Sequence, residues 1–322
     1  MRITGFMPLY NGIYGQYPFL EMIALALPLV DEFLVNDGGS TDGTREVLEE
    51  AASLNRKIKI VDYPHVKGDA YQGLDDAIEY TMSQATGDWL IEIQADEYFP
   101  VCFHDRVKQN IKHADKYGFN SIRHTRFDTE YLHFNNFFDM FFDEGDASKT
   151  IRIFKNLPNI KSYDGGDNFC YQDNFNSKQY TRHDLSPEYE TNNFISVNML
   201  SLFPIDVFIR QQMHCNHYDV NHSDEARYEK FLAAQKELNV KETKIINLKN
   251  INITSIKNFG EQLNSLKNKN QPSKKLSHEI LESLIKQNYY TIRKEIFEYI
   301  KNENLIYKNQ TQYENNIPTF ED

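Results

Sequence analysis

Short apolar runs alternate with amphipathic runs along the first hundred residues. Four runs have the length and the apolar or alternating pattern of β-strands: Ile3–Leu9, Glu32–Asn36, Lys57–Asp62 and Trp89–Gln94. Two runs have apolar positions at helical spacing: Thr44–Leu54, which follows the N-cap candidates Ser40-Thr41-Asp42-Gly43, and Leu74–Ala85. Strands and helices in alternation predict an α/β fold, with a mostly parallel sheet and helices on both faces.

After residue 100 the pattern becomes less regular. Two further strands are expected at Asn120–His124 and Thr150–Lys155, separated by an aromatic-rich stretch at 131–142. That stretch fits a buried core, and it also fits a groove in which aromatic rings stack on a sugar acceptor.

The last hundred residues show helical periodicity from Ser223 onward. A polar, proline-containing linker near 267–273 interrupts it, and it resumes in Leu276–Asn302. We therefore expect a catalytic domain at 1–224, with halves at 1–100 and 101–224, and a helical C-terminal extension at 225–322. Its amphipathic helices predict packing on the catalytic domain or a homo-oligomer, and binding to a membrane surface is the weaker alternative.

The net charge of −12 is concentrated in the first 224 residues. They carry 19 Lys and Arg against 34 Asp and Glu, whereas residues 225–322 carry 16 against 13. An acidic front half excludes nucleic acid as a partner, because that affinity comes largely from Lys and Arg on phosphates. A small phosphorylated ligand would need a cation between its phosphates and the carboxylates. Three cysteines, no membrane-length apolar run and no signal-peptide pattern predict a cytoplasmic protein.

Three motifs at the ends of predicted strands carry the chemistry. They are Met7-Pro-Leu-Tyr-Asn-Gly12, Phe33-Leu-Val-Asn-Asp-Gly-Gly-Ser-Thr-Asp-Gly-Thr44 and Ala85-Thr-Gly-Asp-Trp-Leu-Ile-Glu-Ile-Gln-Ala-Asp-Glu97. Their order and spacing resemble those of family-2-like inverting glycosyltransferases. The resemblance covers the first hundred residues well and 101–224 loosely. It implies a Rossmann-like, nucleotide-sugar-binding sheet of the GT-A type, and transfer of a sugar from a nucleoside diphosphate donor to a hydroxyl acceptor with inversion.

The resemblance places the donor site at the ends of the first two strands and at the acidic motif. We expect contacts with the nucleotide sugar from Pro8, Tyr10, Asn11, Asp37, Gly38 and Asp96, and a contact with phosphate from Arg152. Two positions depart from the family pattern. Gly38 stands where the family has its second aspartate, and Gln94 stands where it has the first acidic residue of Asp-x-Asp.

The same resemblance predicts a divalent cation, Mn2+ or Mg2+, as cofactor. Asp96 is the aspartate expected to hold the ion against the donor diphosphate, and His217 resembles the histidine that such transferases add to the metal site. Hydrogen-bonded histidines without a metal are one alternative. A zinc site is another, and its ligands would be His214, Cys215, His217 and His222.

An inverting transfer needs a carboxylate that deprotonates the acceptor hydroxyl. Related sequences carry a functional polar residue in an aromatic-Gly turn after an Arg-Leu-Phe-Arg strand, and Tyr163-Asp-Gly-Gly-Asp167 occupies that place here. We therefore favour Asp167 as the base over Asp164, Asp143 and Glu144. An ordinary solvated turn at Asp167 is the alternative.

Two other functions fit part of the pattern. A degenerate, non-catalytic member that binds a nucleotide or a partner would explain Gln94, and a metal-dependent hydrolase or nucleotidyltransferase could use Asp96, His214 and His217. No Gly-x-Gly-x-x-Gly follows the first strand, which argues against a dinucleotide-binding dehydrogenase. The leading hypothesis predicts a UDP- or GDP-sugar as donor and a glycan, lipid-linked or protein acceptor. It places the enzyme in the cytoplasm, with peripheral contact with the membrane as an option.

Overall fold

The computed structural model of the chain describes residues 1–13, 15, 17–64, 70–130, 139–142, 147–163, 165–171, 185–201, 244–247, 296–303 and 305. The first hundred residues form β1 (Ile3–Leu9), α1 (Phe19–Ala26), β2 (Glu32–Asp37), α2 (Thr44–Leu54), β3 (Ile58–Asp62), α3 (Ala70–Ser83), β4 (Trp89–Glu92) and β5 (Glu97–Tyr98). The next hundred form η1 (Val101–Phe103), α4 (His104–Tyr117), β6 (Ser121–Glu130), β7 (Asp139–Phe142), β8 (Ala147–Lys155), β9 (Ile160–Tyr163), β10 (Asn168–Tyr171) and β11 (Glu188–Ser201). Later in the chain lie β12 (Lys244–Asn247) and a short helix at 296–301.

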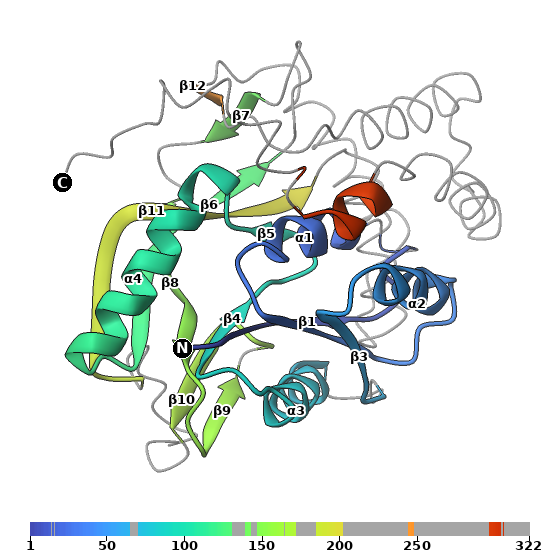
Figure 1. Cartoon of the computed structure of the whole chain (residues 1–322), viewed down its shortest axis with the longest axis horizontal. Coiled ribbons are helices and arrows are strands. Elements are labelled where there is room, and N and C mark those ends of the chain that lie inside the picture. The colour runs from blue at the N-terminus through green and yellow to red at the C-terminus, as the bar shows by residue number, and fades with distance from the viewer. Residues whose placement is uncertain are drawn as a thin grey trace, which may run out of the picture.

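Eight strands form one sheet in the order β3-β2-β1-β4-β8-β6-β11-β5 (Figure 1). The neighbours β3, β2, β1 and β4 are parallel, and β6 pairs in parallel with β11. Only β8 and β5 are antiparallel to their neighbours in this sheet. The predicted α/β fold with a mostly parallel sheet is therefore confirmed, and the carboxyl ends of β1, β2, β3 and β4 meet at one edge.

Successive side chains of the strands point to opposite faces of the sheet, and each face is covered by an apolar layer. The larger layer joins one face of the sheet to α1, α2, α4 and the helix at 296–301, as Met7, Val35 and Ile91 show. The smaller layer joins the other face to α3 and β10, with Phe6, Leu34 and Leu90 as the strand residues. Because successive side chains of a strand point to opposite faces, a charged residue inside these strands must enter one of the two layers.

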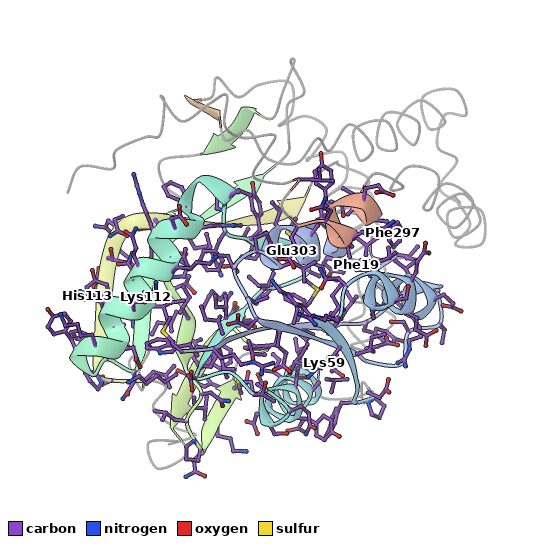
Figure 2. The ribbon with its side chains drawn as sticks, in the orientation of Figure 1. Phe19, Lys59, Lys112, His113, Phe297 and Glu303 are labelled. Atoms are coloured by element: carbon purple, nitrogen blue, oxygen red, sulfur yellow. The ribbon has the colours of Figure 1, made fainter. Side chains whose placement is uncertain are left out.

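The short helix at 296–301 packs into the larger apolar layer. Ile296, Phe297 and Ile300 are buried in the larger layer (Phe297 is labelled in Figure 2). The Asn55 side-chain amide donates to the Ile300 carbonyl at 2.9 Å, and Lys57 Nζ donates to Glu303 Oε2 at 2.7 Å. These contacts lie where α2 ends and β3 begins, which is the edge of the sheet opposite the strand carboxyl ends.

Several elements differ in detail from the sequence pattern. The bounds predicted for α2 are confirmed, but α3 starts at Ala70, before Leu74, and β4 ends at Glu92, before Gln94. The apolar run before β2 forms a helix, α1, that we did not predict. Lys244–Asn247 is a strand paired with β7, although helical periodicity covers this segment. The linker at 267–273 and the helical block before 296 lie outside the described residues.

The start of α2 lies within the predicted N-cap segment, and its N-cap residue is Gly43, whose φ of 98° is in the left-handed region. The Thr44 N–H donates to Asp42 Oδ1 at 3.0 Å. The polar side chain of Ser40 faces the loop after β1. Among the described residues, no helix is long and apolar enough to cross a membrane.

Candidate active site

The loops after β1 and β2 are joined by hydrogen bonds at the carboxyl edge of the sheet. The Gly38 backbone N–H donates to the Leu9 carbonyl at 2.8 Å. The Asn11 N–H donates to Ser40 Oγ at 2.8 Å, and the Thr41 N–H donates to Asn11 Oδ1 at 2.8 Å. Asn11 has a φ of 47°, which asparagine tolerates better than most residues. The structure thus joins the loop after β1 to the loop after β2, with the Asn11 side chain holding the second loop.

Asp37 ends β2 with its carboxylate buried at this edge. Its Oδ1 accepts from the Ser40 N–H at 3.0 Å, and its Oδ2 lies 3.6 Å from Arg45 Nη1. Arg45 also pairs with Asp62, which is opposite Asp37 in the register of β2 and β3. The hydrogen bond to Asp62 is the main reason that the pKa of Arg45 lies above its usual value. Sequence reasoning missed Arg45, which fixes the edge of the site next to Asp37.

The acidic motif forms a turn between β4 and β5. The Glu97 N–H donates to the Gln94 carbonyl at 3.1 Å, and Asp96 is half-buried inside this turn. Pro8 and Tyr10 are also half-buried, at the end of β1. Because β1, β2 and β4 are adjacent and parallel, all the predicted donor-site residues except Arg152 lie at the same edge.

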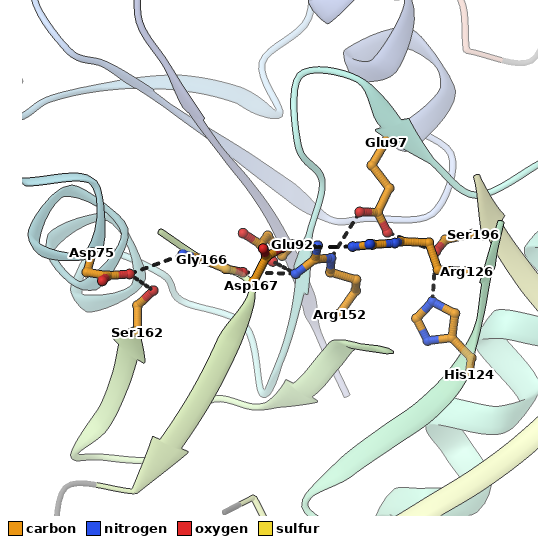
Figure 3. A network of polar contacts seen from close by, with 10 residues as sticks. All are labelled: Asp75, Glu92, Glu97, His124, Arg126, Arg152, Ser162, Gly166, Asp167 and Ser196. Carbon is orange, nitrogen blue, oxygen red and sulfur yellow. Dashed lines mark hydrogen bonds and ion pairs between the residues drawn. The ribbon is translucent and has the colours of Figure 1, made fainter. Parts of the chain in front are cut away.

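Arg152 lies in the centre of a buried polar network rather than at the surface (Figure 3). Its side chain and that of Glu92 are both 0% exposed, and Nη1 donates to Glu92 Oε2 at 2.8 Å. Nε donates to Glu97 Oε2 at 3.0 Å, and Nη1 also donates to the Gly166 carbonyl at 2.9 Å. Nη2 lies 3.3 Å from Asp167 Oδ1. Glu97 in turn accepts a 2.8 Å hydrogen bond from Ser196 Oγ.

Asp167 follows a tight turn between β9 and β10 that is held from two sides. From α3, Asp75 Oδ1 accepts hydrogen bonds from Ser162 Oγ at 2.7 Å and from the Gly166 N–H at 3.1 Å. From β8, Arg152 binds the Gly166 carbonyl. The Asp167 side chain itself is 62% exposed, so the turn presents its carboxylate to solvent. The turn therefore holds an exposed carboxylate on a backbone that is fixed from two elements.

Burial shifts the protonation of the groups below the site. It raises the pKa of Glu92 to about 8 against the opposing effect of Arg152. It also raises the pKa of Asp75, although the hydrogen bonds from Ser162 and the turn N–H groups oppose the shift. Burial lowers the pKa of His124 to about 3, so this histidine is neutral where Nε2 lies 3.0 Å from Ser196 Oγ.

The predicted metal site is only partly within the described residues. In the part of the chain that the structure describes, no group of three His, Cys, Asp or Glu side chains could hold a metal ion. Asp96 supplies one half-buried carboxylate at the edge of the sheet. Mg2+ and Mn2+ suit carboxylate and water oxygens, and Mg2+ is often held by one or two carboxylates plus substrate phosphates. Asp96 fits such a site if a diphosphate supplies the remaining oxygens.

Several predicted residues lie outside the described part of the chain. They are the alternative bases Asp143, Glu144 and Asp164, the metal ligand His217, and the other members of the alternative zinc site, His214, Cys215 and His222. Their roles stay predictions.

Sequence reasoning also missed the carboxylates that support the site. Glu92 interrupts the apolar run of β4, and Arg152 stands between two isoleucines of β8. Opposite charges inside two otherwise apolar strands are a signal for a buried ion pair, since isolated buried charges are very costly. Asp75 gave no such signal, because it follows the helical pattern of α3 beside a second aspartate.

The fold and the site define an α/β domain with its ligand site at the carboxyl ends of parallel strands. The family model described as Glycosyl transferase family 2 matches residues 6–175, which is more than half of the chain. The chain belongs to this family and is a glycosyltransferase.

Solved structures that the chain matches share little sequence with it. S. aureus TarS 1–349 in complex with UDP-GlcNAc is 15% identical, with a TM-score of 0.36 over 97% of this chain and 93% of that one. The mannosyltransferase PcManGT from Pyrobaculum calidifontis, in complex with GDP-Man and Mn2+, is 14% identical, with a TM-score of 0.40 over 98% and 88%. For a longer S. aureus TarS structure, the TM-score is 0.38 at 13% identity, over 94% of this chain and 55% of that one. No curated protein matches the sequence.

Proposed function

We propose that this chain transfers a sugar from a nucleoside diphosphate donor to a hydroxyl acceptor with inversion at the anomeric carbon. The observation that carries the proposal is the chain of contacts from the acidic turn to Asp167. One guanidinium, that of Arg152, binds both Glu97, next to Asp96, and Asp167. The residue after Asp96 and the exposed Asp167 carboxylate are therefore linked across the carboxyl end of β4.

Each described residue then has a defined task. The ends of β1 and β2, with Asn11 and Asp37, would bind the nucleoside, and Asp96 would hold a Mn2+ or Mg2+ ion at the diphosphate. When bound, such an ion neutralises charge on the leaving nucleoside diphosphate. Asp167 would take the proton of the acceptor hydroxyl as its oxygen attacks the anomeric carbon and the bond from that carbon to the phosphate oxygen breaks. One attack on the face opposite the leaving group inverts the configuration.

The direct test is release of nucleoside diphosphate from a panel of UDP- and GDP-sugars, with and without Mn2+. We expect metal-dependent release with one donor. Asp96→Asn should weaken calorimetric binding of UDP or GDP in the presence of Mn2+. Asp88→Asn is the matched control, because Asp88 lies at the amino end of β4 and contacts Arg2. Binding without release would favour the non-catalytic alternative that Gln94 suggests, and release of inorganic phosphate or pyrophosphate would favour a hydrolase or nucleotidyltransferase.

The second test concerns the base. Asp167→Asn should lower turnover by at least about 100-fold, the low end for general acid–base catalysis, with nearly unchanged donor affinity. The same loss from a change at Asp143, Glu144 or Asp164, with Asp167→Asn active, would assign the base to that residue.

A further inference from the structure

Arg152 is connected to both halves of the candidate site through separate atoms. Its Nε binds the Glu97 carboxylate, which follows Asp96 in the turn between β4 and β5. Its Nη1 and Nη2 reach the Gly166 carbonyl and Asp167 Oδ1, in the turn between β9 and β10 (Figure 3). Because a guanidinium is planar and rigid, atoms bound to its different edges are held at fixed positions relative to one another.

The surroundings of Arg152 leave it little freedom to bind a ligand directly. Its side chain is 0% exposed, and its nitrogens face four acceptors of the protein. Ser196 binds the other oxygen of Glu97, so that carboxylate is fixed on both sides. Strands β4 and β8 are antiparallel, and Ile91 pairs with Ile153. One step further along the two strands, Glu92 lies opposite Arg152. The guanidinium is therefore fixed to the sheet itself.

We propose that Arg152 is a positioning residue that sets the placement of Asp167 relative to the acidic turn that carries Asp96. The proposal rests on the proposed function, in which these two carboxylates serve the acceptor hydroxyl and the donor diphosphate. Arg152 acts through Glu97, Gly166 and Asp167 and takes no proton. Its interaction with a donor phosphate would be indirect, through the residues that it places.

The test compares Arg152→Gln with Arg123→Gln in the full chain. Arg123 is the matched control, because it is also a buried strand arginine and binds Glu188 through two nitrogens, at 2.8 and 3.1 Å, in contacts that do not include the network. The first readout is amide hydrogen exchange. We expect Arg152→Gln to speed exchange at both turns, residues 94–98 and 165–168, whereas Arg123→Gln speeds it at neither. Faster exchange at only one turn, or at none, would overturn the proposal.

The second readout is turnover, measured as release of nucleoside diphosphate from the active donor with water as the acceptor. Misplacement by about 1 Å can cost on the order of 100-fold, so we expect Arg152→Gln to lower kcat by about 10- to 100-fold. Donor KM should rise as well, because the variant also loosens the turn that carries Asp96. The double variant with Asp167→Asn should lose less turnover than the product of the two single losses, because part of the Arg152 effect acts through Asp167. A loss of turnover in the double variant equal to the product of the two single losses would contradict the positioning of Asp167 by Arg152.

The two readouts separate this proposal from the proposed function. If the wild type releases no nucleoside diphosphate but both turns loosen in Arg152→Gln, the transfer function fails and the positioning role stands. Arg152→Lys serves where Arg152→Gln does not fold, as judged by a thermal melt. A lysine keeps the charge but cannot bind all four acceptors, so we expect the same pattern with smaller effects. A Lys variant with wild-type exchange and wild-type turnover would refute the proposal.

Discussion

Arg152 Nη1 lies 2.8 Å from Glu92 Oε2, and neither side chain is exposed to solvent. The pair lies at the carboxyl end of β4, directly below the acidic turn. Such a buried contact is a poor source of stability, because the cost of taking a charge out of water offsets the attraction gained. The structural role of Arg152 lies in its contacts with Glu97 and Gly166, because these contacts fix both turns of the candidate site.

The first prediction concerns the proton on Glu92. Burial raises its pKa to about 8 in the folded state, against 4.5 as its ordinary value. Between these values only the folded state keeps the proton, so this group's contribution to stability is complete below pH 4.5 and is lost as the pH rises through 8. The loss approaches about 1.4 kcal/mol per pH unit inside that window. Glu92→Gln cannot titrate, so its stability relative to the wild type should increase between pH 5 and 8.

Urea unfolding of both proteins at several pH values measures this difference. Glu188→Gln is the control, because it changes an Arg–Glu pair at which the Glu188 side chain keeps 14% exposure. A stability difference for Glu92→Gln that stays constant from pH 5 to 8 would show that Glu92 is ionised in the folded protein.

The sequence predicts the parts of this site that depend on neighbouring residues better than the parts that depend on contacts between distant strands. Asn11, Asp37 and Asp96 follow apolar runs directly, and parallel strands bring such positions to one edge, so their grouping could be predicted. The contacts of Arg152 could not, because they depend on the antiparallel insertion of β8 between β4 and β6. Likewise, Ser40 and Thr41 precede a helix, so the local sequence predicts that they cap it. In the structure they form hydrogen bonds with Asn11 instead, and Asn11 is about 30 residues away in the sequence.

The second prediction concerns Asn11, which combines a positive φ with a side-chain hydrogen bond to the Thr41 N–H. Asn11→Asp keeps both features and should be nearly as stable as the wild type. Asn11→Gly keeps only the backbone conformation and should lose about 1 kcal/mol, a typical net value for one hydrogen bond. Asn11→Ala also strains the backbone and should lose about 1 kcal/mol more. Denaturant unfolding should give this order, and equal stability of the Gly and Ala variants would contradict it.

The third prediction concerns Gly166 in the turn before Asp167. Its φ is 88°, and a Cβ there would lie 2.6 Å from Ile78 Cδ1 and 2.9 Å from Glu92 Oε1. Gly118 has a φ of 80° at the end of α4, with nothing within 4 Å of its added Cβ. Gly118→Ala should therefore cost only the backbone strain, about 1 kcal/mol, whereas Gly166→Ala should cost at least about 2 kcal/mol. Gly166→Ala should also lower turnover because it displaces Asp167, and equal stability losses at the two glycines would contradict the packing described for this turn.

The last prediction concerns the helix at 296–301, which packs at the edge of the sheet opposite the candidate site. Ile296 and Ile300 are both 0% exposed in the larger apolar layer, so replacing either with alanine should cost about 2–5 kcal/mol. Glu298→Ala, an exposed position on the same helix, is the control and should change stability by less than about 0.5 kcal/mol. Calorimetric binding of UDP or GDP with Mn2+ should stay unchanged in every variant that remains folded, because Asn55 and Lys57 hold the helix at the amino end of β3.

Truncation at Gln271 removes the whole helix, so it should expose the apolar layer, lower solubility or change the oligomeric state, and leave the nucleotide site intact. A truncated chain that keeps its stability, and its mass in light scattering, would show that this helix contributes nothing to the stability of the sheet and its apolar layer.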